Sequence, residues 1–314
     1  MQTGGALPKP DDECAIGRPS SKCLLEGELE TLASIVEKLG SSHIRRGDGK
    51  KILEVLMRET QCDSEECVIC EITTRVEGTP YESIVTRIRE LAFKPKGPQD
   101  LDALLDNFIL MHLGLQVEAG YPGVKFGGVL TYDFMINPVT SVFGYPQTIT
   151  ESYSKTKWDK LQFILNMDHR MGVGTHWVAL CINTKDGQME YTDSYGRPPS
   201  GGLIQSSRVC PPITDERGRY VSLLVEWINS VQTEFIKIGV MMKFVYNERQ
   251  HQEVRDKSNC GVYAALAIIA SAENQNFFDF NSRHISMNQI SSIRERLYKR
   301  TPGYRATLPK IALQ

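Results

Sequence analysis

The second half of the chain contains, in order, an imidazole, a carboxylate, an amide and a thiol that could together cleave a peptide bond. A cysteine attacks a carbonyl carbon as its thiolate, whereas a free thiol is mostly protonated near neutral pH. An imidazole can take that proton and return it to the leaving amine, and a carboxylate on its other ring nitrogen orients the ring. The oxyanion that forms needs hydrogen-bond donors, commonly a backbone N–H and a side-chain amide. The predicted catalytic residues are Cys260 as nucleophile, His176 as base, Asp193 as the orienting partner and Gln252 as an oxyanion donor.

A β-hairpin would bring the imidazole and the carboxylate together. The run Trp177–Asn183 is apolar and rich in β-favouring residues, which predicts a buried strand, and Met189–Thr192 predicts the returning strand. A two-residue turn at the Asp-Gly pair 186–187 would leave Asp193 roughly 13 Å from His176, at about 3.4 Å per residue. That separation is too long for a hydrogen bond. We therefore predict a longer or bulged loop, with Asp193 just beyond the strand end.

The thiol precedes a segment with the pattern of a buried helix. Residues 261–270 are apolar on every side and rich in alanine, whereas residues 248–257 are polar and predict a loop. Cys260 would lie at the helix N-terminus, where the helix dipole and the free N–H groups favour a thiolate. A nucleophile between a polar loop and a buried helix is both rigidly held and reachable.

This order of residues resembles the SUMO-protease and adenovirus-protease clan of cysteine proteases, and within it the polyprotein proteases of large DNA viruses. The matching motifs are HW at 176–177, EY-x-D at 190–193, PP at 198–199, HQ at 251–252 and CG at 260–261. Upstream, the segments similar to the viral proteins are ETQCDSEECVI at 59–69, FKPKGP at 93–98 and LLDNF at 104–108. The resemblance therefore covers most of the chain, and it implies a papain-like α+β fold.

Two positions depart from the family pattern. Gln252 lies eight residues before Cys260, where the family usually has six or seven. The loop therefore contains an insertion, or another residue such as Gln250 is the donor. The orienting position is acidic, Asp193, as in the SUMO proteases, whereas a viral member of the family has an amide there.

Other interpretations of single residues stay open. His169 competes for the base role, although the run after His176 is the better strand. Trp177 is predicted to bind substrate by stacking near the site, or else only fills the core. A lone cysteine before an alanine-rich helix is more often structural than catalytic, so the case rests on four features in order.

The predicted fold class is α+β, a SUMO-protease-like core with a mixed β-sheet flanked by helices and an N-terminal helical arm. Apolar residues recur at steps of three and four over Leu25–Leu39, which predicts one amphipathic arm helix. The proline- and glycine-containing segment Lys94–Pro98 interrupts the helical pattern. We therefore place the arm at residues 1–98 and the protease core at residues 99–314.

The composition is that of an ordinary globular protein. The 314 residues are 41 % hydrophobic and 24 % charged, with a formal net charge of −2. This charge balance gives no indication of a nucleic-acid partner, and no apolar run approaches the ~20 residues of a membrane span. The first residues lack the basic and apolar regions of a secretory signal. We expect neither a membrane partner nor a nucleic-acid partner.

Five of the eight cysteines lie in the arm, namely Cys14, Cys23, Cys62, Cys67 and Cys70. Without a secretory signal, a chain of this length predicts a reducing compartment and mostly free thiols. The C-x4-C-x2-C spacing resembles metal-ligand spacing, but it lacks the paired short spacings of common zinc sites. We therefore favour unpaired thiols over structural zinc, and we expect no cofactor or metal at the catalytic site.

The resemblance implies a cysteine endopeptidase that cleaves after Gly-Gly in viral structural polyproteins during virion maturation. Its partner would be a polyprotein or capsid or core protein with Gly-Gly-X sites, in the host cytoplasm, at the viral factory, and in the virion. A narrow tunnel roofed by Trp177 would admit only residues without side chains. The Gly4-Gly5-Ala6 sequence could then be a self-trimming site. The alternatives are a deconjugase of ubiquitin-like modifiers, which end in the same Gly-Gly, and an inactive capsid-associated scaffold.

Overall fold

The chain forms two compact units. The computed structural model describes residues 8, 13–19, 22–40, 44, 48–135, 142–168, 170, 172, 174–199 and 222–306. One unit comprises Met1–Gln99 with Glu295–Gln314, and the other comprises Asp100–Arg294. The sequence-based division assigned the last 20 residues to the core, whereas here they group with the first 99. Strand pairing explains the difference, because β1 (Lys96–Pro98) pairs in parallel with β7 (Lys299–Thr301).

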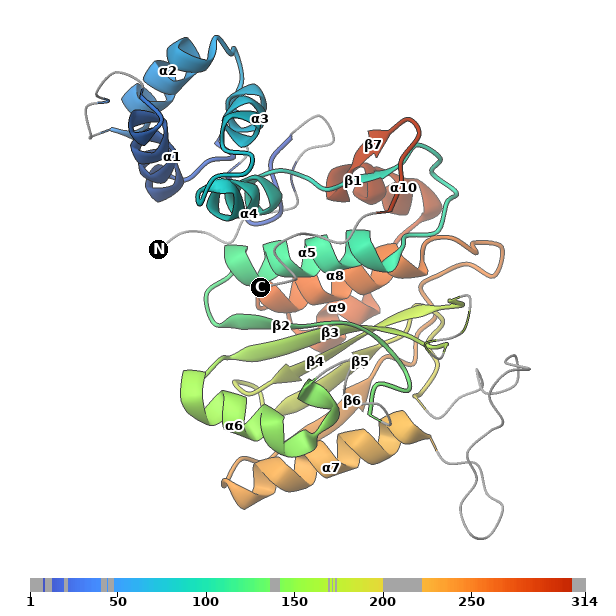
Figure 1. The fold of residues 1–314 in the computed structure, drawn as a ribbon. Coiled ribbons are helices and arrows are strands. Elements are labelled where there is room, and N and C mark those ends of the chain that lie inside the picture. The colour runs from blue at the N-terminus through green and yellow to red at the C-terminus, as the bar shows by residue number, and fades with distance from the viewer. Residues whose placement is uncertain are drawn as a thin grey trace, which may run out of the picture. The chain divides into compact units, whose positions relative to one another are not determined.

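Four helices make up most of the first unit (Figure 1). They are α1 (Glu26–Lys38), α2 (Gly49–Thr60), α3 (Glu65–Arg75) and α4 (Glu82–Ala92). The predicted amphipathic arm helix is confirmed as α1, whose apolar stripe, including Leu29, Leu32 and Val36, is buried in the core of this unit.

Two disulfides overturn the expectation that the arm thiols are free. Cys14 is bonded to Cys23 and Cys62 to Cys67, which leaves Cys70 as the one described free thiol of the arm. The Cα–Cα distances of 4.7 and 5.5 Å lie within the span that a disulfide bridges.

The segment around Cys14 is fixed by backbone contacts with the end of α4. Cys14 forms an isolated antiparallel bridge with Phe93, and Ala15 N donates to Ala92 O at 2.9 Å. These pairings join residues almost 80 positions apart, and they are part of what holds Cys14 where it can bond Cys23. Cysteine spacing could not reveal this approach.

The second unit is built on a five-stranded mixed sheet in the order β2-β3-β4-β5-β6. Its strands are β2 (Val124–Thr131), β3 (Lys160–Asn166), β4 (Trp177–Asn183), β5 (Gln188–Thr192) and β6 (Lys243–Tyr246). The outer pairs β2–β3 and β5–β6 are parallel, and the two central pairings are antiparallel. The predicted mixed sheet flanked by helices, and with it the α+β fold class, is confirmed.

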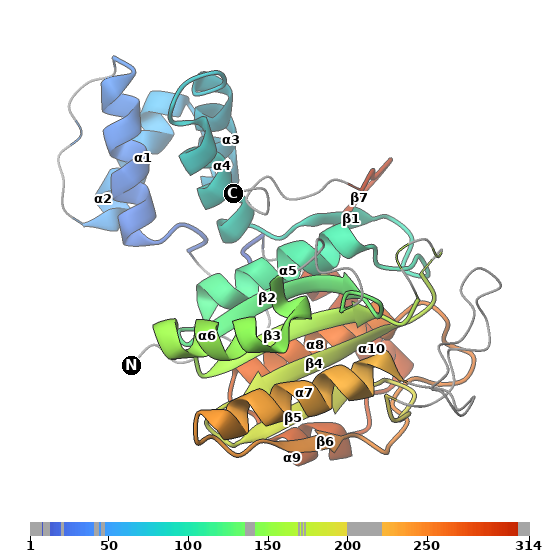
Figure 2. The same ribbon diagram turned by 60° about the horizontal axis from the view of Figure 1, so that its bottom comes forward.

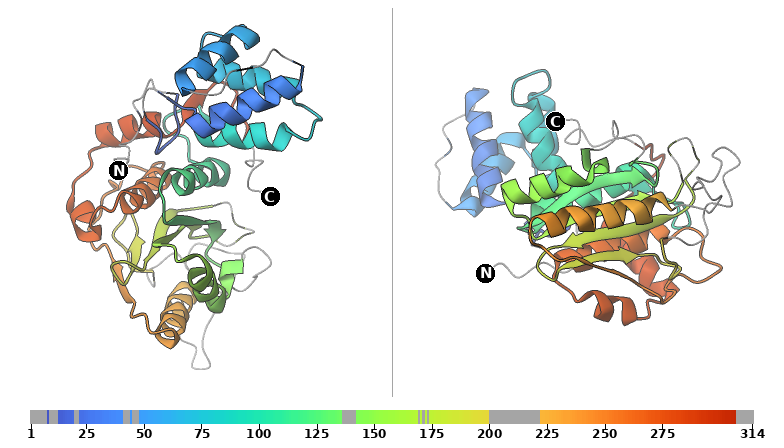
Figure 3. Two further views of the ribbon diagram at one scale, coloured as in Figure 1. Left: turned by 90° about the vertical axis from the view of Figure 1, so that its left-hand side faces the viewer. Right: turned by 90° about the horizontal axis from the view of Figure 1, so that it is seen from below.

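Helices cover both faces of this sheet, as Figure 1 shows and as the rotated views of Figure 2 and Figure 3 repeat. On one face lie α5 (Asn107–Gly120) and α8 (Cys260–Ala272), followed by the short α9 (Phe277–Ser282). On the other face lie α6 (Pro146–Thr156), after the short 3-10 helix η2 (Val142–Gly144), and α7 (Leu223–Lys237). Helix α10 (Met287–Leu297) crosses the division between the units. Among the described helices, none offers a stretch of the length and hydropathy that a bilayer crossing requires.

The β4–β5 hairpin has the longer loop that the sequence predicted. Asn183 pairs with Gln188, so four residues, 184–187, connect the strands instead of two. In this register Thr192 pairs with Ala179, and the strand ends before Asp193. Both strands are almost wholly buried, which agrees with their apolar sequences.

Helix α8 is the buried helix predicted for residues 261–270. It begins at Cys260, and all 13 of its residues are buried against β4, β3 and α5. A helix that is apolar on every side is held by packing around its whole circumference. Its first residue is therefore held in place as firmly as its centre.

Candidate active site

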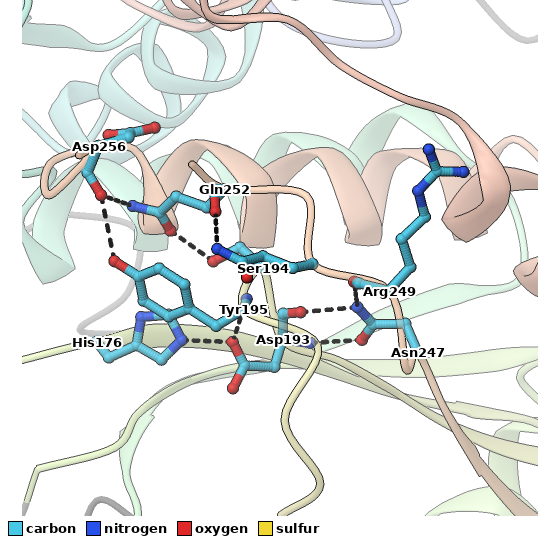
Figure 4. Close-up of polar contacts among 9 residues, drawn as sticks. His176, Asp193, Ser194, Tyr195, Asn247, Arg249, Gln252 and Asp256 are labelled. Carbon is cyan, nitrogen blue, oxygen red and sulfur yellow. Dashed lines mark hydrogen bonds and ion pairs between the residues drawn. The ribbon is translucent and has the colours of Figure 1, made fainter. Parts of the chain in front are cut away.

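His176 and Asp193 meet at the same end of the β4–β5 hairpin (Figure 4). His176 immediately precedes β4 and Asp193 immediately follows β5. The distance between His176 Nε2 and Asp193 Oδ1 is 2.7 Å, and both side chains are buried, at 4 % and 3 % exposure. The four-residue loop makes this contact possible, because it shifts the register two residues from that of a two-residue Asp-Gly turn.

The Asp193 carboxylate is held in position by its own backbone and its neighbours. Asn247, which follows β6, accepts a hydrogen bond from Asp193 N at 2.8 Å and donates one to Asp193 O at 2.7 Å. Tyr195 N donates to the same Oδ1 that binds the imidazole, at 2.8 Å. Because these bonds fix both the main chain and the carboxylate oxygen, the imidazole has a stationary partner.

Cys260 approaches the imidazole from the start of α8. Its side chain is buried, and the thiol lies close enough to His176 to act on the pKa of the imidazole. Because Nε2 binds Asp193, the other ring nitrogen, Nδ1, is left for the sulfur. Burial alone would lower the pKa of His176, but the hydrogen bond to Asp193, the interaction with Cys260 and the charges of both partners outweigh burial and raise it to about 9. The imidazole therefore carries a proton at neutral pH, which stabilises a neighbouring thiolate, as the helix N-terminus also does.

Gln252 is fully buried and held at both ends of its amide. Its Oε1 accepts from Ser194 Oγ at 2.6 Å, and its Nε2 donates to Asp256 O at 2.8 Å. Its backbone N also donates to Ser194 O at 2.8 Å. An amide nitrogen has two protons, so one N–H remains for a ligand after the bond to Asp256. The alternative donor Gln250 is exposed, and its Nε2 donates to Gln252 O at 2.7 Å.

Tyr195 covers the imidazole. Its ring stacks on His176 with the centroids 4.9 Å apart and 30° between the planes, and the Arg197 guanidinium lies over it at 4.7 Å. Its hydroxyl donates to Asp256 O at 3.2 Å. Burial raises the pKa of Tyr195, and the charge of Cys260 raises it further, so the hydroxyl stays protonated and can donate.

A cavity of about 410 Å³ is lined by Trp177 from the start of β4. Its other lining residues include Leu104, Leu105, Asn166, Gly172 and Gly174. Trp177 Nε1 donates to Leu105 O at 3.0 Å, so the indole is both buried and tied to the segment before α5. A Cβ added at Gly261 would lie 3.1 Å from Leu105 and 3.3 Å from Trp177. The cavity wall therefore packs directly against the residue that follows Cys260.

A hydrogen bond joins His176 to Asp193, Cys260 acts on the same imidazole from the start of α8, and Ser194 and Asp256 link Gln252 to the same site. His169, the other histidine considered for the base role, lies outside the described residues.

Four further residues of this site were missed by sequence reasoning, namely Ser194, Tyr195, Asn247 and Asp256. Ser194 and Tyr195 directly follow the predicted carboxylate, which is the one signal that could have found them.

One group in the described part of the chain has metal-ligand geometry, and it lies in the first unit. The ligand atoms of Cys14, Cys23 and Glu65 are within 4.8 Å of one another. Both sulfurs are joined in a disulfide, and a disulfide sulfur is not the thiolate that zinc prefers. The residues described do not favour the structural zinc interpretation.

Comparison with known proteins identifies the class. Residues 147–302 match the model of the Ulp1 protease family, C-terminal catalytic domain. The chain is 25 % identical over 293 residues to a SUMO-1 cysteine protease of African swine fever virus, covering 85 % of this chain and 99 % of that protein. It is 24 % identical over 214 residues to a putative thiol protease of Acanthamoeba polyphaga mimivirus, covering 67 % and 62 %.

A solved structure shares the fold. The crystal structure of the African swine fever virus protease matches with a TM-score of 0.60 at 21 % identity, covering 94 % of this chain and 97 % of that one. The fold, together with the comparisons, defines a cysteine protease. Residues 147–302 of the chain form a catalytic domain of the Ulp1 protease family, of the kind found in large DNA viruses.

Proposed function

We propose that this cysteine protease is an endopeptidase that cleaves after Gly-Gly in viral structural polyproteins during virion maturation. The observation that carries the catalytic assignment is the 2.7 Å contact between the buried His176 imidazole and the Asp193 carboxylate, with the buried Cys260 close enough to act on the pKa of that imidazole. Its viral relatives and the Gly-Gly preference implied by the family resemblance support the substrate class.

The residues divide the reaction between them. The Cys260 thiolate attacks the scissile carbonyl carbon, and the carbonyl oxygen becomes an oxyanion. That oxyanion accepts hydrogen bonds from the second N–H of Gln252 Nε2 and from a backbone N–H at the start of α8. The His176 imidazolium then donates its proton to the leaving amine, and the neutral imidazole activates the water that hydrolyses the thioester. Asp193 keeps the ring oriented through both half-reactions.

The cavity beside Trp177 gives the Gly-Gly preference a physical basis. Two of its lining residues, Gly172 and Gly174, have no side chains, while the indole and Leu105 form an apolar wall. A Cβ at Gly172 would approach the Asp168 carboxylate to 2.2 Å, so this loop is packed tightly against its support.

A deconjugase of ubiquitin-like modifiers remains the second candidate. It is supported by the description of the matching family as Ulp1 proteases and by the name of the African swine fever virus relative, a SUMO-1 cysteine protease. Modifiers of this type end in Gly-Gly, so the same cavity would suit both substrates. The inactive scaffold has no support, because the chain is a cysteine protease.

One experiment separates these functions. Wild-type protein and Cys260→Ser are incubated with a Gly-Gly-X peptide and with a SUMO fusion and a ubiquitin fusion. We expect the wild type to cleave the peptide at a higher kcat/KM than either fusion, and Cys260→Ser to cleave none. A higher kcat/KM on a modifier fusion would support the deconjugase instead, and undiminished cleavage by Cys260→Ser would refute the nucleophile assignment.

We place the activity in the host cytoplasm, at the viral factory, and in the virion, because the relatives are proteins of large DNA viruses. The predicted self-trimming site Gly4-Gly5-Ala6 lies outside the described residues, as does Gly201-Gly202. Gly127-Gly128 lies in strand β2, whose residues on both sides of this pair are held by hydrogen bonding to β3, so cleavage there would require the strand to leave the sheet. Intact-mass spectrometry of wild type against Cys260→Ala tests the trimming: identical N-termini would refute it.

A further inference from the structure

Asp256 contacts both sides of the place where the oxyanion would form. Its side chain binds the residues that lead into α8, and its carbonyl oxygen binds Gln252 and Tyr195. We propose that Asp256 is the positioning residue of the oxyanion pocket, which holds the Gln252 amide and the first N–H groups of α8 in one fixed geometry. This inference rests on the catalytic roles proposed above for Cys260 and Gln252.

The side chain of Asp256 holds the residues at the start of α8. Asp256 Oδ1 accepts from Ser258 N at 3.1 Å, Asn259 N at 3.2 Å and Asn259 Nδ2 at 3.1 Å. These bonds fix the two residues directly before Cys260, and so they fix the direction in which the free N–H groups of the helix point. A donor acts on an oxyanion only if it is aimed before the reaction begins.

The main-chain carbonyl of Asp256 holds the Gln252 amide and the ring that stacks on the imidazole. Asp256 O accepts from Gln252 Nε2 at 2.8 Å and from the Tyr195 hydroxyl at 3.2 Å. The first bond sets the rotation of the Gln252 amide and leaves its other N–H for substrate. The second fixes the ring that stacks on His176. A movement of residue 256 would therefore displace both the Gln252 amide, which is the oxyanion donor, and the Tyr195 ring, which stacks on the base.

The buried Asp256 carboxylate is linked to the buried Arg294 guanidinium through the side-chain amide of Asn259. The residue is 4 % exposed, and Oδ2 has no hydrogen-bond partner among the described residues. Arg294 is fully buried, and its NH1 donates to Asn259 Oδ1 at 2.8 Å, while Asn259 Nδ2 donates to Asp256. A buried carboxylate is unfavourable unless it is paired, so Asp256 and Arg294 stabilise each other across Asn259. A surface loop that only connects two elements has no need of such a pair.

The same residue explains the long spacing between Gln252 and Cys260. Asp256 N donates to Glu253 O at 2.9 Å, which closes a turn within the extra residues of the loop. The turn exposes Val254 at 79 % while Asp256 returns to the interior. The insertion is thus accommodated outside the site, and Asp256 is the point at which the chain re-enters it.

The test compares Asp256→Ala, Asp256→Asn and the control Ser222→Ala. Ser222 caps α7 in the same unit, on the opposite face of the sheet, and its hydroxyl also donates to Pro199 O, so its loss reports the stability effect of losing helix-terminal hydrogen bonds away from the site. The measurements are kcat and KM for the Gly-Gly-X peptide, the melting temperature, and the rate of Cys260 alkylation by iodoacetamide. Alkylation depends on the thiolate and not on oxyanion donors.

We expect Asp256→Ala to lower kcat about 30- to 300-fold with KM nearly unchanged, because a misplaced oxyanion donor weakens binding of the transition state. Alkylation should stay within about threefold of wild type, and Asp256→Asn, which keeps the Oδ1 acceptor, should recover at least about tenfold of the lost kcat. In a Gln252→Ala background, Asp256→Ala should reduce kcat by a smaller factor, since residues that act through one another are not additive.

Wild-type kcat in Asp256→Ala would overturn the positioning role, as would a full additive loss in the Gln252→Ala background. Loss of alkylation in parallel with kcat would also overturn it, because the defect would then lie in the thiolate. These outcomes are distinct from a failure of the proposed function, which would appear in the wild type as a higher kcat/KM on a modifier fusion than on the Gly-Gly-X peptide, and from a failure of the nucleophile assignment, which would appear as activity retained in Cys260→Ala.

Discussion

The two halves of the candidate site are built on different principles. His176 and Asp193 sit at the ends of two paired strands, so the register of the sheet brings them together. Gln252 and the residues that precede Cys260 lie on an irregular loop. There, hydrogen bonds of buried side chains hold the chain in place of the backbone hydrogen bonds of a sheet. A sheet aligns residues through repeated backbone bonds, whereas a loop must be aligned residue by residue.

The two halves of the site should respond differently to mutation. Changes around the sheet half should act only through the residue that is changed, since its backbone is supported by neighbouring strands. Changes in the loop half should spread, because Ser194, Gln252 and Asp256 support one another. The following experiments test that difference.

The largest effect should come from the residue where the two halves meet. Cys260→Ala removes the nucleophile from the start of α8, and we expect peptide cleavage to fall by at least about 10⁴-fold. The melting temperature should change little, since alanine fits a buried helix position. Residual activity above about one per cent of wild type would contradict the assignment, with kcat measured by peptide cleavage and active-site titration.

The sheet half should tolerate an amide. Asp193→Ala should lower kcat about 10²- to 10³-fold, whereas Asp193→Asn should stay within about tenfold of wild type, because asparagine keeps an Oδ1 acceptor for His176 Nε2 and serves this role in other cysteine proteases. Steady-state kinetics on both variants measures the difference. Equal losses for the two would show that the negative charge, and not the orientation, is what matters.

In the loop half, the loss of activity should be larger the closer the changed residue lies to the oxyanion. Gln252→Ala should lower kcat about 10²-fold, and Ser194→Ala, which only holds Gln252 Oε1, about tenfold. Gln250→Ala is the matched control, an exposed glutamine two residues away, and should leave kcat unchanged. If Gln250→Ala showed the larger loss, it would be the oxyanion donor.

The pH profile should report the raised pKa of His176. The protonated imidazole is the acid for the leaving amine, so activity should fall on the alkaline side with a midpoint at about pH 9. Because the folded pKa lies above the ordinary 6.5, the stability that the proton contributes is complete below about pH 6.5 and is lost as pH rises through about 9.

Removing the carboxylate sharpens this pH test. In Asp193→Asn the alkaline midpoint of kcat/KM should move to lower pH, because the aspartate is one of the partners that raise the pKa of His176. An unshifted midpoint would mean that another group sets the alkaline limb.

The smallest effect should come from the wall of the cavity. A Cβ at Gly261 would press on Leu105 and Trp177, so Gly261→Ala should raise KM about three- to tenfold while kcat changes less. Ala267→Gly, in the same buried helix, controls for altered helix stability. A fall in kcat with unchanged KM would place the effect on Cys260 instead of the cavity.

Local patterns predicted the parts of this fold that depend on neighbouring residues. The apolar run of β4 and the uniformly apolar α8 were predicted because burial on all sides leaves few polar residues in the sequence. The length of the β4–β5 loop was predicted only as longer than two residues. Its exact form depends on a contact with β3, since Thr184 N donates to Asp159 O at 2.9 Å.

The cysteines show the opposite case. Sequence reasoning predicted free thiols in the arm, yet Cys14 and Cys23 are bonded. The pairing depends on a backbone bridge between Cys14 and Phe93, which no local pattern encodes. The free, buried Cys260 was predicted correctly as unpaired because it was judged by its neighbours in a motif.

By itself, the sequence determined which residues could do the chemistry and which short elements carry them, because residue type and local periodicity are written in the chain. Only the tertiary structure decided that a thiol and an imidazole 84 positions apart become neighbours that act on each other's charge, and that Ser194 and Asp256 hold the Gln252 amide. The physical reason is range: strands and helices follow from neighbouring residues, whereas the register of a sheet and the path of a loop follow from what packs against them.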